Sequence, residues 1–295
     1  MSDLSLCLPF EPPARGGGGF GFLRLWERWL TQHGIPWTRA ITDRHPVLFV
    51  NSWHTRPVNI RIARCLRPGL RVIHRVDGWP PLYGRTDGIE RRLVRLNREA
   101  TLTIYQSQWA RETLQALGFG DGPVIYNPVD VTMFYPRAPS ETSQYHVAVV
   151  SWSDNPSKGL RAYRDIIHAN QEITFINYGR LLIGNAPNLR NMGEVPWTQL
   201  PALLRECEVL LTMADHEACP NHVLEALASG LPVLYRDSGA TRELVADAGA
   251  PVTVDTFAAA FASWRLSDEQ ARRRALEFAC DRIFPQYLKA ISDVL

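Results

Sequence analysis

Hydrophobic positions along the chain alternate between two spacings. Short continuous apolar runs are followed by longer stretches in which apolar residues recur every three or four positions, as they do on one face of a helix. In the first half this pattern predicts strands at 4–9, 47–51, 71–76, 102–105 and 124–126. It predicts helices at 20–33, 59–66, 88–99 and 108–117. Buried strands that alternate with helices indicate a parallel sheet covered on both faces.

The same alternation starts again after a stretch without periodicity. Residues 136–145 are rich in Pro, Ser, Thr and Glu and form a candidate linker. Beyond it the pattern predicts strands at 147–150, 173–177, 209–211 and 231–234, helices at 160–169, 198–207 and 241–248, and helix over 267–295 with a break at Pro285. We therefore predict an α/β protein of two doubly wound, Rossmann-like domains, 1–140 and 141–281, that face each other across a cleft.

Composition indicates the cellular compartment of the protein. The chain has 295 residues, of which 45% are hydrophobic, but no apolar run approaches the ~18–20 residues of a membrane span. The first residues lack a basic segment followed by an apolar one, so no signal peptide is expected. The five cysteines are scattered, with neither metal-ligand spacing nor a disulfide rhythm. These features predict a cytoplasmic protein with reduced thiols and no metal site.

Charge is distributed unevenly along the chain. The net charge is only +2, yet the first 140 residues have an excess of arginine and the remainder an excess of carboxylates. A basic first half favours an anionic partner, such as a phosphorylated acceptor, a membrane surface or nucleic acid. Solvated surface arginines without a partner would give the same pattern.

The most informative segment reads HEACPNHVLEALASGLPV and begins at His216. It places Glu217 before a predicted helix and Glu225 inside it. Pro220 suits the first turn of that helix, and Gly230 suits its end. A strand, a loop that carries a carboxylate, and a helix N-terminus together form a place that can hold an anionic ligand.

This segment resembles the Glu-x7-Glu signature of retaining GT-B glycosyltransferases of family 4, the group 1 glycosyl transferases. The resemblance implies that Glu217 lies by the donor sugar and that Glu225 binds the ribose of the nucleotide. It also implies that the last helix, 282–295, packs back on the first domain. The helix start would border the donor phosphates through Cys219, Pro220 and Asn221.

A second segment, SDNPSKG, follows the first strand of the second half and opens a helix. A polar turn with a lysine can hold phosphate through backbone N–H groups and the ammonium. The segment is similar to the family's Gly-Arg…Lys-Gly motif, which implies that Lys158 neutralises the donor diphosphate. Ser153 stands where the family has arginine, so a second cation must come from elsewhere or is absent. The candidates are Arg180, Arg236 and Arg242. Lys158 could also be an ordinary surface lysine.

The glycine-rich run GGGGFG at 16–21 lies before the first predicted helix. It matches Gly-x-Gly-x-x-Gly and is followed by Asp43, as in a dinucleotide site. The resemblance instead implies that Gly17 and Gly18 approach the donor phosphates and the acceptor. A flexible loop remains the third interpretation.

Two further segments extend the resemblance. The sequence HRVDG at a strand end resembles a motif of some of these enzymes, in which His74 or Asp77 would orient the sugar or the acceptor. His74 could equally lie in the core, because strand residues alternate between faces. The sequence MGEVP resembles the strand and turn that contact the base, through Gly193 and Val195.

These patterns predict a glycosyltransferase that moves a sugar from a nucleotide diphosphate sugar to an acceptor hydroxyl with retention. We expect catalytic roles for Glu217 and for Asp77 or His74. No Asp-x-Asp motif occurs, so we expect no metal, and no cofactor besides the donor. The basic first half favours an anionic acceptor and peripheral contact with the inner membrane face, and no stable nucleic acid partner is expected. Two alternatives remain open: an NAD-dependent oxidoreductase that uses residues 16–21, and a nucleic-acid-binding or DNA-glycosylating protein.

Overall fold

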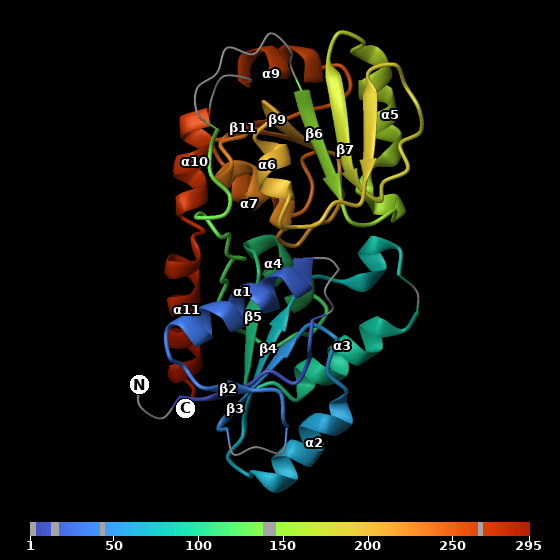
Figure 1. Cartoon of the computed structure of the whole chain (residues 1–295). Coiled ribbons are helices and arrows are strands. Elements are labelled where there is room, and N and C mark those ends of the chain that lie inside the picture. Colours follow the sequence, from blue (N-terminus) through green and yellow to red (C-terminus); the bar gives the residue numbers. More distant parts are fainter. Residues whose placement is uncertain (1–3, 13–17, 42–44, 86, 138–145, 265–267) are drawn as a thin grey trace. The chain divides into compact units, whose positions relative to one another are not determined.

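The structure is a computed structural model, and it describes residues 4–12, 18–41, 45–85, 87–137, 146–264 and 268–295. The chain divides into two compact units (Figure 1). Unit 1 comprises Met1–Pro128 and Cys280–Leu295, and unit 2 comprises Val129–Ala279. The C-terminal helix thus belongs with the first unit. Most of the candidate linker at 136–145 lies outside the described residues.

Unit 1 is built on a parallel sheet of five strands with the order β2-β1-β3-β4-β5. Its strands are β1 (Leu6–Cys7), β2 (Trp37–Thr38), β3 (Val47–Asn51), β4 (Arg71–Val76) and β5 (Leu102–Tyr105). The strand predicted at 124–126 is reduced to an isolated bridge between Val124 and Tyr105. The order of the strands reverses between β1 and β3.

The helices of unit 1 are α1 (Gly18–Gln32), α2 (Pro57–Leu66), α3 (Ile89–Arg98), α4 (Gln108–Gln115) and α11 (Cys280–Ser292). Helix α1 buries its predicted apolar stripe against α11, where Trp26 packs on Phe284 with ring centroids 4.7 Å apart. Trp29 Nε1 donates to Asp281 Oδ1 over 2.7 Å. These contacts hold the last helix on unit 1.

The helix break predicted at Pro285 is wrong. Helix α11 continues through Pro285, and the chain leaves helical structure earlier, between α10 (Asp268–Leu276) and α11. Proline removes one backbone donor and usually breaks a helix. Here the buried side chains Phe284, Tyr287 and Ile291 fix the helix on unit 1, while Pro285 itself faces solvent. Tertiary packing therefore outweighs the local cost.

Unit 2 contains a parallel sheet of six strands with the order β11-β10-β9-β6-β7-β8. Its strands are β6 (His146–Ser151), β7 (Thr174–Gly179), β8 (Leu189–Gly193), β9 (Val209–Thr212), β10 (Val233–Tyr235) and β11 (Gly249–Pro251). Besides α10, its helices are η2 (Pro156–Lys158), α5 (Leu160–Ala169), α6 (Leu200–Leu204), α7 (Asn221–Ala228), α8 (Thr241–Val245) and α9 (Phe257–Trp264). The prediction of two parallel-sheet, Rossmann-like domains is confirmed.

The strand order locates the place where each sheet can bind a ligand. Open parallel sheets bind ligands beyond the carboxyl ends of their strands, at the point where the strand order reverses. In unit 2 that point lies between β6 and β9, and in unit 1 it lies between β1 and β3. Among the described helices, none is both long and apolar enough to cross a membrane.

Candidate functional site

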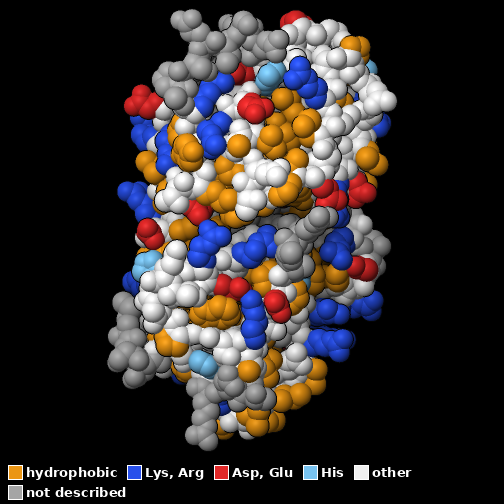
Figure 2. Space-filling view, viewed as in Figure 1, with side chains coloured by type: hydrophobic (Ala, Val, Ile, Leu, Met, Phe, Trp, Pro, Cys, Tyr) orange, Lys and Arg blue, Asp and Glu red, His pale blue; other side chains and the backbone are white. Residues whose placement is uncertain are grey.

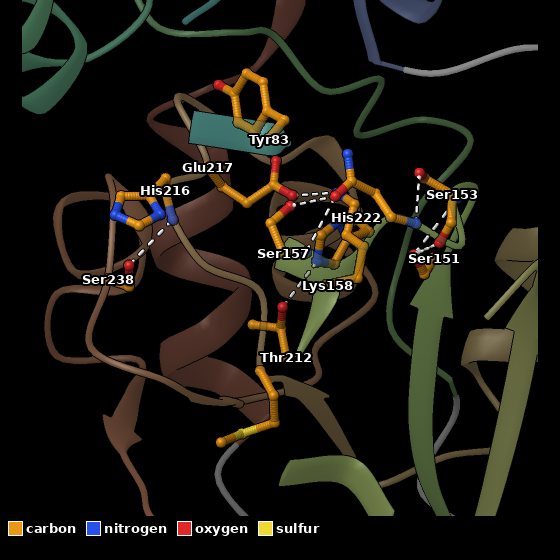
Figure 3. A network of polar contacts seen from close by, with 12 residues as sticks. Tyr83, Ser151, Ser153, Ser157, Lys158, Thr212, His216, Glu217, His222 and Ser238 are labelled. Carbon is orange, nitrogen blue, oxygen red and sulfur yellow. Dashed lines mark hydrogen bonds and ion pairs between the residues drawn. The ribbon is translucent and has the colours of Figure 1, made fainter. Parts of the chain in front are cut away.

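Lys158 and Glu217 meet at the reversal point of unit 2. Lys158 ends η2, which follows β6, and Glu217 lies in the loop that follows β9. The ammonium and the carboxylate form an ion pair (Figure 3). Their side chains are 20% and 16% exposed, so both are largely removed from solvent but remain within reach of a ligand. The structure thus brings together two of the residues that the sequence singles out.

Tight packing of two loops holds Lys158 in place. The Asn155 side chain accepts from Ser157 N, and Asp215 N donates to Ser157 O over 2.7 Å. Gly159 has a φ of +79°, and a Cβ there would lie 2.0 Å from Met213 O. Only glycine allows the loop after β6 to approach the end of β9 so closely. The glycine of the Lys-Gly sequence is therefore required by the local geometry.

A third loop, after β10, fixes the backbone of Glu217. His216 has a φ of +60° and donates its N–H to Ser238 Oγ over 3.0 Å. Ala240 N donates to Glu217 O, and a Cβ on Gly239 would lie 2.5 Å from that same oxygen. A left-handed non-glycine residue is uncommon and tends to occur at functional sites. Three loops thus converge on one carboxylate.

The charge state of this cluster is set by its neighbours. Burial opposes ionisation of Glu217, but nearby positive charge, chiefly that of Lys158, outweighs that effect and lowers the pKa of Glu217. Burial lowers the pKa of His222 to about 4, and its Nε2 lies 3.1 Å from Thr212 Oγ1. At neutral pH the Glu217 carboxylate is therefore ionised and the His222 imidazole is neutral.

Helix α7 begins beside this pair and carries the second glutamate. Cys219 and Pro220 are buried immediately before the helix, which starts at Asn221. Glu225 is only 7% exposed, and Trp197 Nε1 donates to its Oε1 over 2.8 Å. Trp197 was missed by the sequence analysis, although it lies close after the MGEVP segment. The backbone N–H groups of the first turn can accept an anion.

The residues expected near the base lie on another part of the sheet. Gly193 ends the edge strand β8 with a φ of +68°, and it is exposed. Val195 follows in the next turn and is partly buried. Trp197 comes from the same turn, so the segment reaches the site through its contact with Glu225.

The three candidate second cations all have carboxylate partners. Arg180 pairs with Glu194, Arg242 pairs with Asp237, and Arg236 pairs with Asp215 over 3.0 Å. Only the last of these pairs joins two of the loops around Glu217, because Asp215 follows β9 and Arg236 follows β10. Among the three candidates, the geometry therefore favours Arg236. No group of three potential metal-ligating side chains was found in the part of the chain that the structure describes.

In unit 1 the end of β4 meets the end of β3. Ser52 has a φ of +51°, and its Oγ donates to Asp77 Oδ1. A Cβ on Gly19 would lie 3.5 Å from Asp77 Oδ2, and Asn51 Nδ2 donates to Gly19 O. The described end of the glycine-rich segment therefore adjoins Asp77. Gly18 opens α1, whereas Gly17, Gly16 and Asp43 lie outside the described residues.

His74 lies inside unit 1 and faces the core. It is completely buried, and burial lowers its pKa to about 4. Its Nε2 donates to Ser52 O over 3.1 Å, and its Nδ1 accepts from Asn97 Nδ2 over 3.2 Å. Both ring nitrogens are therefore engaged by the protein. This geometry favours the core alternative for His74 and leaves Asp77 as the residue that faces outward.

His54 was not singled out by the sequence. Its ring stacks on Phe10 with centroids 4.5 Å apart and lies 4.9 Å from the Phe20 ring. Burial lowers its pKa, although the charge of Asp77 opposes that shift. Asp77, Ser52 and His54 together form a polar cluster beside two aromatic rings. A histidine flanked by Trp53 after a strand is the only sequence signal that could have indicated it.

Comparison with known proteins is consistent with this site. Residues 179–279 match the family model described as Glycosyl transferases group 1. No curated protein matches the chain in sequence. Among solved structures, Anabaena Alr3699/HepE in complex with UDP-glucose is similar, with a TM-score of 0.76 and 18% identity over 98% of this chain and 99% of that one.

Two other structures share the fold. AviGT4, a glycosyltransferase involved in avilamycin A biosynthesis, has a TM-score of 0.70 and 18% identity over 97% of this chain and 96% of that one. Sucrose-phosphate synthase from Thermosynechococcus elongatus has a TM-score of 0.67 and 15% identity, with 92% and 77% covered. The chain therefore has the GT-B fold, and the similarity to the group 1 glycosyl transferase family model is confined to residues 179–279. None of these similarities supports the oxidoreductase or nucleic-acid alternatives.

Proposed function

We propose that this chain is a glycosyltransferase that moves a sugar from a nucleotide diphosphate sugar to an acceptor hydroxyl. The observation that carries the proposal is the Lys158–Glu217 pair, which lies at the reversal point of the unit 2 sheet beside the start of α7. A cation and a carboxylate side by side match a donor that has a diphosphate next to a polyhydroxylated ring. The family match over residues 179–279 supports the same activity.

Lys158 and the start of α7 would stabilise the leaving group. Departure of the sugar leaves negative charge on the diphosphate, and a preorganised ammonium with backbone N–H groups lowers the energy of that charge. This arrangement supplies the electrostatic stabilisation that a metal ion provides in other enzymes, so we propose metal-independent transfer with no separate cofactor. Arg236 would supply further positive charge from the same group of loops.

The two glutamates would bind different parts of the donor. Glu217 is ionised at neutral pH, since its pKa is lowered, and a carboxylate accepts hydrogen bonds from sugar hydroxyls. Glu225 accepts from Trp197 at one oxygen, and a carboxylate has capacity for further donors such as ribose hydroxyls. We propose a uridine diphosphate sugar as the first donor to test, because Alr3699/HepE forms complexes with UDP-glucose and with UDP.

Asp77 would orient the acceptor hydroxyl. Its carboxylate is held by Ser52 at the reversal point of the unit 1 sheet, next to the described end of the glycine-rich segment. His74 would act on the same cluster indirectly, by fixing the Ser52 carbonyl. We further propose that the anomeric configuration is retained, as the resemblance of the Glu217–Glu225 segment implies.

Thermal unfolding with nucleotides tests the donor assignment. The protein is melted with UDP, GDP, ADP, dTDP or NAD at millimolar concentration. A ligand present at about 100 times its Kd stabilises the fold by about 2.7 kcal/mol. We expect a shift with one nucleoside diphosphate that disappears in Glu225→Ala and persists in Glu172→Ala, an exposed glutamate of unit 2. A shift with NAD alone would contradict the proposal.

Turnover tests the remaining parts of the mechanism. Transfer from UDP-glucose to candidate acceptors is followed by proton NMR, in which the anomeric coupling of the first product reports retention or inversion. We expect an α-linked product from the α-linked donor and an unchanged rate in EDTA. An inverted product, or a rate abolished by EDTA and restored by a divalent cation, would contradict retention or metal independence respectively.

A further inference from the structure

Helix α2 exposes an apolar stripe along its whole length. Val58, Ile62 and Leu66 are 54%, 48% and 56% exposed, and their spacing of four places them on one face of the helix. Ile60 and Ala63 bury the opposite face in unit 1. The remaining large exposed hydrophobic residues in the described part of the chain lie singly elsewhere: Leu117, Tyr135, Leu182, Met192, Leu276 and Leu295. Single exposed apolar residues are ordinary, whereas an aligned row indicates an interaction surface.

The neighbouring helix α3 exposes a row of arginines. Helices α2 and α3 pack together, and α3 buries Leu93 and Leu96 against unit 1. Its outer face presents Arg91, Arg92, Arg95 and Arg98. In Figure 2, orange and blue side chains lie next to one another over the part of unit 1 where Figure 1 places these two helices.

The arginines are only weakly compensated by acids. Arg61 adds a side chain that is 74% exposed on α2, beside the apolar stripe. Glu90 and Glu99 lie at the two ends of α3 with side chains only 24% and 21% exposed, and Asp87, which precedes the helix, is paired with Arg85. Glu99 is already shared between Arg61 and Arg64. The surface therefore combines an apolar stripe with a net positive charge.

A lipid bilayer with anionic headgroups fits both properties at once. Arginines near such a surface are attracted to the headgroups, while apolar side chains from a helix that lies in the interface enter the acyl boundary. A nucleic acid would neutralise the arginines but leave the row of Val58, Ile62 and Leu66 in water. A purely apolar partner surface would leave the arginines without counter-charge.

We propose that the surface formed by α2 and α3 docks unit 1 on an anionic membrane, with Val58, Ile62 and Leu66 inserted and the α3 arginines on the headgroups. This proposal goes beyond glycosyl transfer and does not depend on it. None of these residues belongs to the candidate donor or acceptor clusters. The nucleotide-dependent thermal shift therefore reports on the donor site independently of membrane binding.

Vesicle co-sedimentation tests the proposal. The full chain is mixed with vesicles of phosphatidylcholine alone, or of phosphatidylcholine with phosphatidylglycerol, over a range of NaCl concentrations. We expect binding only to the anionic vesicles, and weaker binding as salt screens the charges. Ile62→Ser/Leu66→Ser and Arg92→Glu/Arg95→Glu should each reduce the vesicle partition coefficient about tenfold or more. Circular dichroism and thermal melts verify that these surface variants remain folded.

Matched controls come from unit 2. Leu182→Ser replaces an apolar residue that is 72% exposed by a polar one. Arg161→Glu reverses the charge of a side chain that is 97% exposed. Both should bind vesicles like the unaltered protein. Equal loss in the controls, equal binding to neutral vesicles, or no vesicle binding would overturn the proposal. So would a dimer that Ile62→Ser/Leu66→Ser dissociates without any vesicle binding, or duplex DNA binding in place of vesicle binding.

Discussion

The Lys158 ammonium pairs with the Glu217 carboxylate even though the two residues follow different strands, β6 and β9. The pair joins the group expected to hold the diphosphate to the group expected to hold the sugar. Lys158 lowers the pKa of Glu217 and so keeps that carboxylate charged when no ligand is bound. Donor binding then exchanges one set of polar contacts for another without creating an unpaired buried charge.

Replacing Lys158 by alanine should lower turnover by about 10²–10³-fold, because the leaving diphosphate loses a preorganised cation. The fold should survive, since Lys158 is partly exposed. The measurement is kcat for sugar transfer or donor hydrolysis, with Lys289→Ala as the control. Lys289 is the other lysine of the chain, and it lies on α11 paired with Asp293. Equal rates in the two variants would contradict the assigned role of Lys158.

Replacing Gly159 by alanine should destabilise the protein more than the same change at Gly118. Both glycines have a positive φ, +79° and +85°, so each substitution has a conformational cost of about 1–2 kcal/mol. At Gly159 the new Cβ also meets Met213 O at 2.0 Å, whereas nothing lies within 4 Å at Gly118. Urea unfolding measures the difference. Equal losses would show that the two loops do not need their close approach.

Stability should fall as the pH decreases from about 6.5 to about 4, partly because of His74. The folded state holds this imidazole neutral with a pKa of about 4, while the unfolded chain protonates near 6.5. The unfolded state therefore binds more protons in that window, and the stabilisation present above pH 6.5 is lost on acidification. The full shift corresponds to about 3 kcal/mol.

Urea unfolding at a series of pH values checks this expectation. His74→Gln keeps a donor and an acceptor but cannot titrate, so the slope of stability against pH should decrease in that window. His168→Gln on the exposed side of α5 provides the control and should keep the slope. An unchanged slope in His74→Gln would mean that His74 does not titrate as its burial implies.

Much of the fold follows from the sequence because periodicity is a local property. The stripe of Phe22, Trp26 and Trp29 predicts α1, and the continuous apolar run at 47–51 predicts β3. The strand order depends on contacts between distant segments, so periodicity does not contain it. Strands as short as β2 and β11 give too little pattern to detect. The alanine-rich stretch FAAAFASW, which forms α9, lacks the polar positions that reveal a helical period.

Residues of the candidate site could be predicted from the sequence only where they belong to a recognisable motif. Glu217, Lys158 and Glu225 follow from their resemblance to a known signature, and the structure places the first two together. The contact between Trp197 and Glu225 joins segments 28 residues apart, and neither segment contains a sequence pattern that predicts it. Likewise, the alternation of strand faces does not determine whether His74 or Asp77 has the functional role. Both residues contact Ser52, but the Ser52 carbonyl and Asn97 engage both ring nitrogens of His74 inside unit 1, whereas Asp77 lies beyond the end of β4.

Asp77→Asn should reduce transfer to the acceptor while leaving nucleotide binding intact. Asp77 belongs to unit 1, and the nucleotide is expected to bind unit 2, so the two effects can be separated. In Ser52→Gly the new glycine adopts the positive φ readily, so the substitution removes only the hydroxyl that orients Asp77. It should therefore raise the acceptor KM by a smaller factor than Asp77→Asn does. Initial rates at varied acceptor concentration distinguish these effects. A lost UDP shift in Asp77→Asn would contradict an acceptor role.

Trp197→Phe should weaken nucleotide binding without changing the chemical step. The substitution keeps an aromatic ring beside Phe134, whose ring centroid lies 5.7 Å from that of Trp197, but it removes the N–H that Glu225 accepts. A buried carboxylate that loses one donor is less well held, at a cost of about 1–3 kcal/mol in binding, or roughly 5- to 150-fold in Kd. Isothermal titration with the nucleoside diphosphate that gives the thermal shift measures this change, with Trp264→Phe on α9 as the control. Because Glu225 is expected to contact the ribose and not the reacting carbon, kcat at saturating donor should stay within about twofold. A large fall in kcat with unchanged Kd would instead place Trp197 at the reacting centre and remove the reason for assigning Glu225 to the nucleotide.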